Sequence, residues 1–219
     1  MRPHIGALAG CAVLLVLSGC AHDLVLGDAK PSDTRIGRPA QLAAVTPQDW
    51  PDACELLTDD EIAALLPEHQ GVERTPSPVT ILDTDFLDGQ DLGGEAAHGS
   101  CDFAADHGNG DYVRITITID AVGSPGDVLA RYVAERNDEL ERKTEYDVVK
   151  DVEGTGARAC FRSATNIFSS LSCHHRWLAF EVSAAGIGEV PDVPDEETDQ
   201  ALADRLVPEV VRTVAAKVR

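Results

Sequence analysis

The chain has 219 residues, and its 38 acidic against 18 basic side chains give a formal net charge of −20 at pH 7. This excess of negative charge repels nucleic acids and anionic lipid headgroups. The composition therefore excludes a nucleic-acid-binding function, and we expect no nucleic-acid partner.

The first 20 residues have the pattern of a lipoprotein export signal. Arg2 provides a positive start, residues 7–17 form an apolar run, and small residues precede Cys20. The segment Leu17-Ser18-Gly19-Cys20 resembles the site read by the lipoprotein signal peptidase. This resemblance implies cleavage before Cys20 and a diacylglycerol on its thiol. The alternative is an uncleaved transmembrane helix, but an apolar run of about 17 residues is at the lower limit for spanning a bilayer.

Cleavage at this point would leave a chain of one-domain size. It would remove Arg2 alone among the charged residues, which leaves 17 basic against 38 acidic side chains and a formal charge of −21. Stable anchoring takes two or more acyl chains, so membrane lipid is the first expected partner, through acylated Cys20. The expected location is the extracytoplasmic face of the cell membrane.

Four cysteines remain beyond the anchor: Cys54, Cys101, Cys160 and Cys173. An even number of cysteines in an exported chain indicates two disulfides with three connectivities to choose from. We favour sequential pairing, Cys54–Cys101 and Cys160–Cys173, worth roughly 4 and 3 kcal/mol on the chain-entropy model. A zinc site is the alternative, but the spacing of zinc ligands is missing.

The expected domain organisation has three parts. Residues 1–19 are a signal peptide, and residues 20–49 combine the lipidated Cys20 with a flexible tether that has proline, glycine and polar residues but no apolar period. As a coil, this tether would have an end-to-end distance of roughly 30 Å. Residues 50–219 form a single globular domain, which we expect to be a monomer.

The domain begins with a short capped helix, which is followed by a segment without hydrophobic periodicity. Thr58 and Glu61 have the spacing of a capping box. The helix dipole explains the acidic residues of the first turn, so they indicate no catalytic pair. Residues 67–99 show no period and predict an irregular segment. The acidic run at 83–89 fails as a calcium loop, since its glycine is one position late and position 12 is Gly94.

The strongest pattern is a hairpin followed by a helix. Residues 101–104 predict a short strand, and residues 112–119 alternate between apolar and polar side chains, which indicates a strand with one buried face. Ser124-Pro125 then marks a helix start. Apolar residues at helical spacing extend this helix to Leu140.

A second antiparallel set is expected between residues 148 and 183, with a Cys160–Cys173 link tying neighbouring strands. An apolar stripe then predicts a C-terminal helix, kinked or split near Leu206 by Pro208. The fold class is therefore α+β: an antiparallel sheet built from hairpins, flanked by helices, with the C-terminal helix packed on the sheet.

Residues suited to catalysis or metal binding are sparse. His174 and His175 are adjacent on a strand, so they point to opposite faces and cannot both hold one metal; we expect them to be exposed in a turn. His98 and His107 are placed in loops near acids. No G-x-S-x-G motif occurs, and every cysteine has a structural assignment. We therefore expect no enzyme, no cofactor and no metal site.

Three short motifs resemble a family of actinobacterial lipoproteins of unknown function, over residues 50–218. They are Cys54-Glu55-Leu56-Leu57-Thr58-x-x-Glu61-Ile62, Cys101-x-Phe103 and Gly154-x-Gly156-x-x-Ala159. The chain departs from the family in having Ala53 in place of proline, Phe103 in place of tryptophan, and no acidic residue near Ala157. The resemblance implies a Cys54–Cys101 disulfide and an antiparallel sheet flanked by helices. It implies no catalytic residue, and the Cys160–Cys173 pair is not part of it.

These observations favour a membrane-anchored lipoprotein acting as a non-catalytic binding, accessory or signalling-regulator module of the cell envelope. An envelope protein is the second expected partner. The alternatives are a calcium- or cation-binding wall protein, favoured only by the charge, and a cell-envelope hydrolase.

Overall fold

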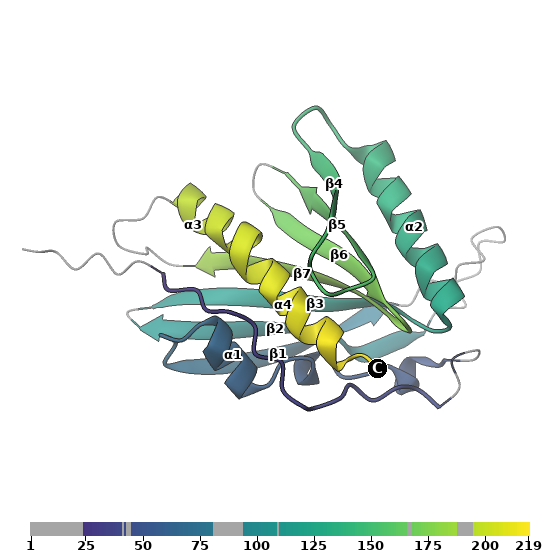
Figure 1. Cartoon of the computed structure of the whole chain (residues 1–219), viewed down its shortest axis with the longest axis horizontal. Coiled ribbons are helices and arrows are strands. Elements are labelled where there is room, and N and C mark those ends of the chain that lie inside the picture. Colours follow the sequence, from purple (N-terminus) through teal and green to yellow (C-terminus); the bar gives the residue numbers. More distant parts are fainter. Residues whose placement is uncertain are drawn as a thin grey trace, which may run out of the picture.

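The computed structural model describes residues 24–40, 42, 45–80, 94–108, 110–165, 168–187 and 195–219. Within these ranges, seven strands form one antiparallel sheet, and helices pack against it (Figure 1). The strands are β1 (Gly71–Thr80), β2 (Glu95–Gly108), β3 (Asp111–Val122), β4 (Val148–Val152), β5 (Ala159–Ala164), β6 (Ser169–His175) and β7 (Leu178–Ile187). The α-helices are α1 (Asp59–Leu65), α2 (Pro125–Arg142), α3 (Asp195–Ala201) and α4 (Val207–Lys217). Shorter helical turns are η1 (Pro47–Asp49), η2 (Ala53–Glu55) and the π-helical η3 (Leu202–Leu206).

The sheet consists of two meanders joined side by side. The strand order is β1-β2-β3-β7-β6-β5-β4, so β1–β3 and β4–β7 each run in chain order and meet where β3 pairs with β7. The α+β architecture predicted from the sequence is confirmed, including the C-terminal helix that contacts the sheet. The prediction of an irregular segment over residues 67–99 is wrong in part, because residues 71–80 form β1 at the edge of the sheet.

Alternation along the strands gives the sheet two different faces. In β6, Leu171 and Cys173 lie in the hydrophobic core with Val210 of α4, while the Ser172 hydroxyl between them donates to Glu135 of α2. Since adjacent strand residues point to opposite faces, α4 and α2 cover opposite sides of the sheet. The predicted hairpin supplies much of this core, with Ile115, Ile117 and Ile119 of β3 fully buried on the α4 side.

The C-terminal helical run changes its winding before Pro208. Proline has no N–H and crowds the carbonyl four residues earlier, so a regular helix cannot pass through it unchanged. The run widens into the π-helical turn η3, in which the Val207 N–H donates to the Leu202 carbonyl, and then continues as α4. The valines of α4 stay buried on the sheet as a result.

Residues 24–40 form an N-terminal strap that lies along α1 and α4. The Gly27 N–H donates to the Leu65 carbonyl at 2.9 Å, and the Ile36 N–H donates to the Lys217 carbonyl at 3.2 Å. Leu24, Leu26 and Ile36 pack against the core. The strap therefore belongs to the folded body, which differs from the flexible tether expected over residues 20–49.

Candidate functional site

Two disulfides brace the region around the sheet. Cys54 of η2 is bonded to Cys101 of β2 with a Cα–Cα distance of 5.1 Å. Cys160 is bonded to its direct cross-strand neighbour Cys173 with a Cα–Cα distance of 4.1 Å. This connectivity is the sequential pairing favoured from the sequence. Disulfides persist in oxidising compartments, so both bonds suggest an extracytoplasmic environment. In the part of the chain that the structure describes, no helix is long and apolar enough to cross a membrane. Cys20 lies outside the described residues.

The strap is fixed by a buried ion pair between α1 and α4. Lys217 Nζ donates to Glu61 Oε2 at 2.7 Å, and both side chains are about 1% exposed. The same carboxylate also accepts the Thr58 N–H at 2.8 Å and the Ser32 N–H of the strap at 2.9 Å. Burial by itself raises the pKa of Glu61, but the Lys217 ammonium and the two N–H donors outweigh it and leave the pKa below its ordinary value.

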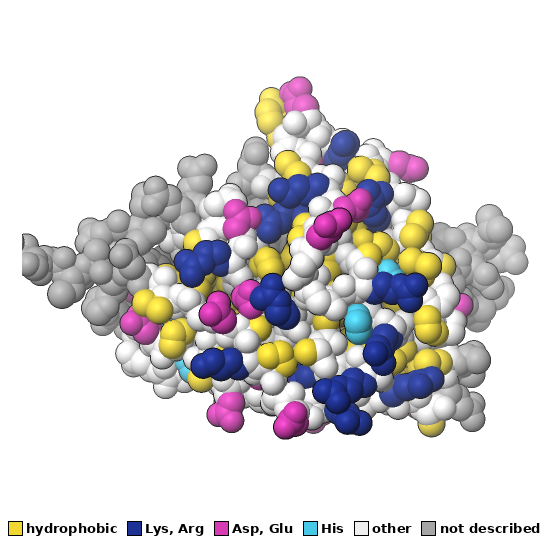
Figure 2. Space-filling view, in the orientation of Figure 1, with side chains coloured by type: hydrophobic (Ala, Val, Ile, Leu, Met, Phe, Trp, Pro, Cys, Tyr) yellow, Lys and Arg dark blue, Asp and Glu magenta, His cyan; other side chains and the backbone are white. Residues whose placement is uncertain are grey.

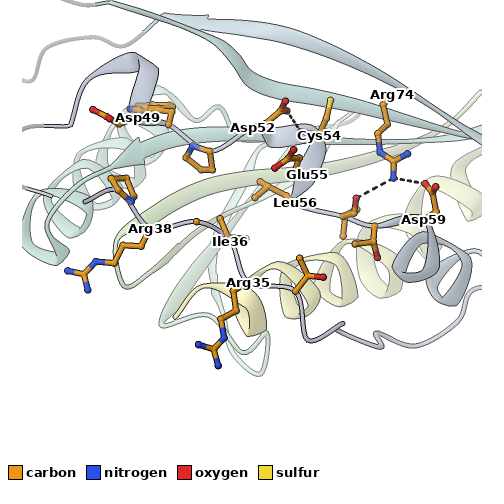
Figure 3. A pocket seen from close by; sticks show the side chains of 17 residues that line it. Arg35, Ile36, Arg38, Asp49, Asp52, Cys54, Glu55, Leu56, Asp59 and Arg74 are labelled. Carbon is orange, nitrogen blue, oxygen red and sulfur yellow. Dashed lines mark hydrogen bonds and ion pairs between the residues drawn. The ribbon is translucent and has the colours of Figure 1, made fainter. Parts of the chain in front are cut away.

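A cleft of about 930 Å³ lies between the strap and the segment that runs from η1 to α1 (Figure 3). Ile36 of the strap and Leu56 face each other across it, while the Arg35 and Arg38 side chains point away into solvent. The cleft exists because the strap crosses over η2 without filling the space beside it. It is lined by residues 34–39, 49–52, 54–59 and Arg74.

Most charged groups of the cleft already have partners in the fold. Arg74 binds Asp59 at 2.6 Å and donates to the Leu57 carbonyl at 3.3 Å. Asp52 accepts the Cys54 N–H at 2.8 Å and lies 2.7 Å from His98 Nδ1. The cleft is therefore a mainly apolar groove with charged rims, which suits binding better than acid–base chemistry.

His98 comes closest to the geometry of a catalytic base. It lies in β2 instead of the expected loop, and its Nδ1 contacts Asp52 Oδ2, an arrangement that orients a histidine in hydrolases. Its described contacts include no serine or cysteine nucleophile, and Asp52 is also used as the cap of η2. The described part of the chain therefore does not bring together a triad around His98.

The other candidate histidines are His174 and His175 of β6 and His107 of β2, and none of them lines the cleft. His174 and His175 point to opposite faces of β6, as predicted, but His174 is buried against Tyr132 with ring centroids 4.8 Å apart, so the expected exposure is wrong for it. Burial lowers the pKa of His174. At the end of β2, burial together with the charge of His69 lowers the pKa of His107. All of these groups favour the neutral imidazole.

A group of carboxylates between α2 and the sheet escaped the sequence analysis. Asp120 of β3, Glu135 of α2 and Glu181 of β7 converge here, and the Ser172 hydroxyl lies 3.2 Å from Glu135 Oε1 and 3.3 Å from Glu181 Oε2. Burial, followed by mutual repulsion, raises the pKa of Asp120 and Glu135, and burial raises the pKa of Glu181. Within the described ranges, no three His, Cys, Asp or Glu side chains are placed to hold a metal ion.

A second hollow, of about 950 Å³, opens on the sheet surface over β1, β2 and β3. Its lining residues include the polar side chains of Thr75, Asp102 and Arg114. Asp102 accepts a hydrogen bond from Thr116 at 2.6 Å, which commits it to the cross-strand pairing. The cleft beside the strap differs from this hollow in having the buried side chains of Leu56 and Leu57 among its lining residues.

The sequence could be compared with known proteins at three levels. No family model matches the chain, and neither a curated protein nor a solved structure matches it.

Proposed function

We propose that this chain is a membrane-anchored extracytoplasmic lipoprotein, acylated on Cys20, whose folded domain is a non-catalytic binding or regulator module of the cell envelope. The lipobox-like segment before Cys20 and the resemblance to actinobacterial lipoproteins support this proposal. The two disulfides agree with an oxidising location.

The observation that carries the proposal is the strap. Leu24 packs against the core and is only four residues after Cys20, and four residues span at most about 14 Å. An acyl group on Cys20 would hold the domain directly at the bilayer surface. The cleft beside the strap would then face the space next to the membrane, where an envelope partner can reach it.

The anchor is tested by the mass of the mature N-terminal peptide, from cells that process lipoproteins. We expect the peptide to begin at Cys20 and to carry fatty acids. The Cys20→Ala variant should lose both the acyl groups and the membrane retention. The Cys11→Ala variant is the matched control, because Cys11 lies in the segment that would be removed, and its product should be unchanged. A purified product that begins at Met1 without fatty acid would contradict the anchor.

The binding role is tested by photocrosslinking in intact cells. A photoreactive residue replaces Glu55, which is exposed at the cleft, and a matched one replaces Glu141, which is exposed on α2. We expect position 55 to capture a defined envelope protein that position 141 does not capture. The same products from both positions, or none from position 55, would rule out the cleft as the binding site.

A further inference from the structure

Five exposed arginines lie on neighbouring segments around the C-terminal end of α4. We call this surface the basic face. Figure 2 shows Lys and Arg side chains gathered where the strap and the end of α4 lie, with few acidic side chains among them. This gathering is unexpected in a chain with a formal net charge of −20. Its arginines are Arg35, Arg38, Arg158, Arg176 and Arg219.

Hydrogen bonds connect the segments that carry these arginines. The strap reaches the end of α4 through the hydrogen bond from Ile36 to Lys217. The C-terminal residue reaches the β6–β7 turn, since Trp177 Nε1 donates to the Arg219 carbonyl at 3.2 Å. Arg158 joins the same turn through the bond from its N–H to the His174 carbonyl at 3.1 Å. The basic face is therefore one continuous surface.

All five arginines of the basic face lack a carboxylate partner among the described residues, whereas five of the other eight described arginines have one. Arg74, Arg136, Arg142, Arg162 and Arg212 each form an ion pair with a carboxylate. In a protein with twice as many acids as bases, five neighbouring cations without partners leave a local positive charge that the fold itself does not use.

The backbone of Arg176 adds a second observation. Its φ is 57°, and it is the one non-glycine residue with positive φ in the described chain. Glycine or asparagine adopts this conformation at the tip of a hairpin more readily than arginine does. The strained position holds an arginine side chain at the exposed tip of the β6–β7 turn.

We propose that the basic face is a docking surface for anionic phospholipid headgroups, and that it holds the domain in one orientation on the membrane. The five cations are spread over the strap, the end of α4, a hairpin tip and the segment before β5. This spread fits an extended charged surface better than a single small anion. The strap runs from the anchoring end of the chain along this same side of the molecule (Figure 1). This last step rests on the proposed acylation of Cys20.

The net charge of the whole chain does not oppose this docking at close range. Charges interact over about 8 Å at physiological salt, so the headgroups respond to the nearest face of the protein. The carboxylate group of Asp120, Glu135 and Glu181 lies on the α2 side of the sheet, with the strap and α4 on the other side. Docking through the basic face turns those acids away from the bilayer.

Vesicle binding by the chain from residue 20 with Cys20→Ser tests the proposal without any contribution from acyl groups. Vesicles of phosphatidylglycerol mixed with phosphatidylcholine are compared with phosphatidylcholine alone, at about 0.1 M salt. The test variant is Arg35→Gln, Arg38→Gln and Arg176→Gln together. The control variant is Arg142→Gln, Lys143→Gln and Lys150→Gln, which removes the same charge from exposed positions at the α2–β4 corner. Thermal melting checks that both variants fold.

We expect binding to the anionic vesicles only, weakened roughly 100-fold in the test variant, because each cation near a charged bilayer strengthens binding about fivefold. The control variant should bind like the parent chain. Equal losses in both variants, or no binding to anionic vesicles, would overturn the proposal. Displacement by inorganic phosphate at equal ionic strength would also overturn it, in favour of a small-anion site. Acylation of Cys20 is measured separately, so either proposal can fail without the other.

Discussion

The Glu61 carboxylate joins three parts of the chain that are distant in sequence. It binds Lys217 near the C-terminus, Thr58 at the start of α1 and Ser32 in the strap. Because the pair is buried, removing one partner destabilises the fold: the remaining charge is then buried without a partner. The same pair tolerates joint replacement by apolar residues much better than the loss of one member.

We therefore expect Lys217→Ala to lower the free energy of unfolding by about 3–5 kcal/mol, measured by chemical denaturation. The double variant Lys217→Met with Glu61→Leu should be closer to the parent protein than the single variant. Removing the exposed pair on α2 with Arg142→Ala should cost less than about 1 kcal/mol. A single variant as stable as the Arg142→Ala control would show that the buried pair does not hold the strap.

The carboxylates beside α2 have raised pKa values, whereas that of Glu61 is lowered, so their effect on stability changes with pH in the direction opposite to that of Glu61. Burial raises the pKa of Glu181 above its ordinary value of 4.5, so the folded protein binds a proton more tightly than the unfolded chain does. The stability that this group contributes is present below pH 4.5 and is lost as the pH rises through its folded-state value. At neutral pH, the ionised group destabilises the fold.

Glu181→Gln removes this charge and keeps a side chain that can bond to Ser172. We expect a higher melting temperature at pH 7 than in the parent protein, and a difference that shrinks as the pH falls towards 4.5. Melting curves across this range measure it. An equal shift of the melting temperature at every pH would mean that burial does not destabilise the ionised carboxylate.

At the scale of elements, the sequence predicted those whose signals are local. The capping box of Thr58 and Glu61, the alternating strand that became β3 and the Ser124 cap of α2 all formed where expected, because each depends on residues a few positions apart. β1 was missed: Pro76 and Pro78 hide a strand that can exist because it lies at the sheet edge. The cleft and the carboxylate group were missed because their members come from separate elements.

The strap is another feature that depends on residues far apart in sequence and that the sequence therefore did not predict. Leu24, Leu26 and Ile36 follow no period, and the surface that receives them is made by α1 and α4, which are far away in sequence. A composition rich in glycine, proline and polar residues is typical of a flexible linker. Such a segment can still be fixed when distant helices offer apolar surface and acceptors for its N–H groups.

Hydrogen exchange distinguishes a bound strap from a tether. The amides of Gly27 and Ile36 should exchange more slowly than in the free peptide, because both donate to buried carbonyls. Leu26→Ser together with Ile36→Ser should remove this protection and lower the free energy of unfolding by about 1–3 kcal/mol. Ala40→Ser, at an exposed position, is the control and should change neither quantity. Exchange at the free-peptide rate in the parent protein would instead support the flexible tether predicted from the sequence.

For the whole molecule, the short distance from Cys20 to Leu24 sets how far an acylated chain can rise from the bilayer. We expect strong energy transfer from a probe on the domain to a dye in the membrane. Inserting about 20 Gly/Ser residues between His22 and Asp23 gives a coil of roughly 25 Å and should weaken the transfer at about 1 M salt, which screens the basic face. An insertion of two residues is the control, and it should leave the transfer nearly unchanged. No response to the long insertion would mean that the domain is held at the membrane by its own surface alone.

The strap also has a consequence for the order in which the fold can be completed. Ribosomes make the N-terminus first, yet Ala29 binds Glu209, which lies 180 residues later, and Ile36 binds the backbone of Lys217. The strap therefore cannot bind in its final position before α4 has been made. Until α4 has been synthesised, the strap lacks the surface to which Ala29 and Ile36 bind.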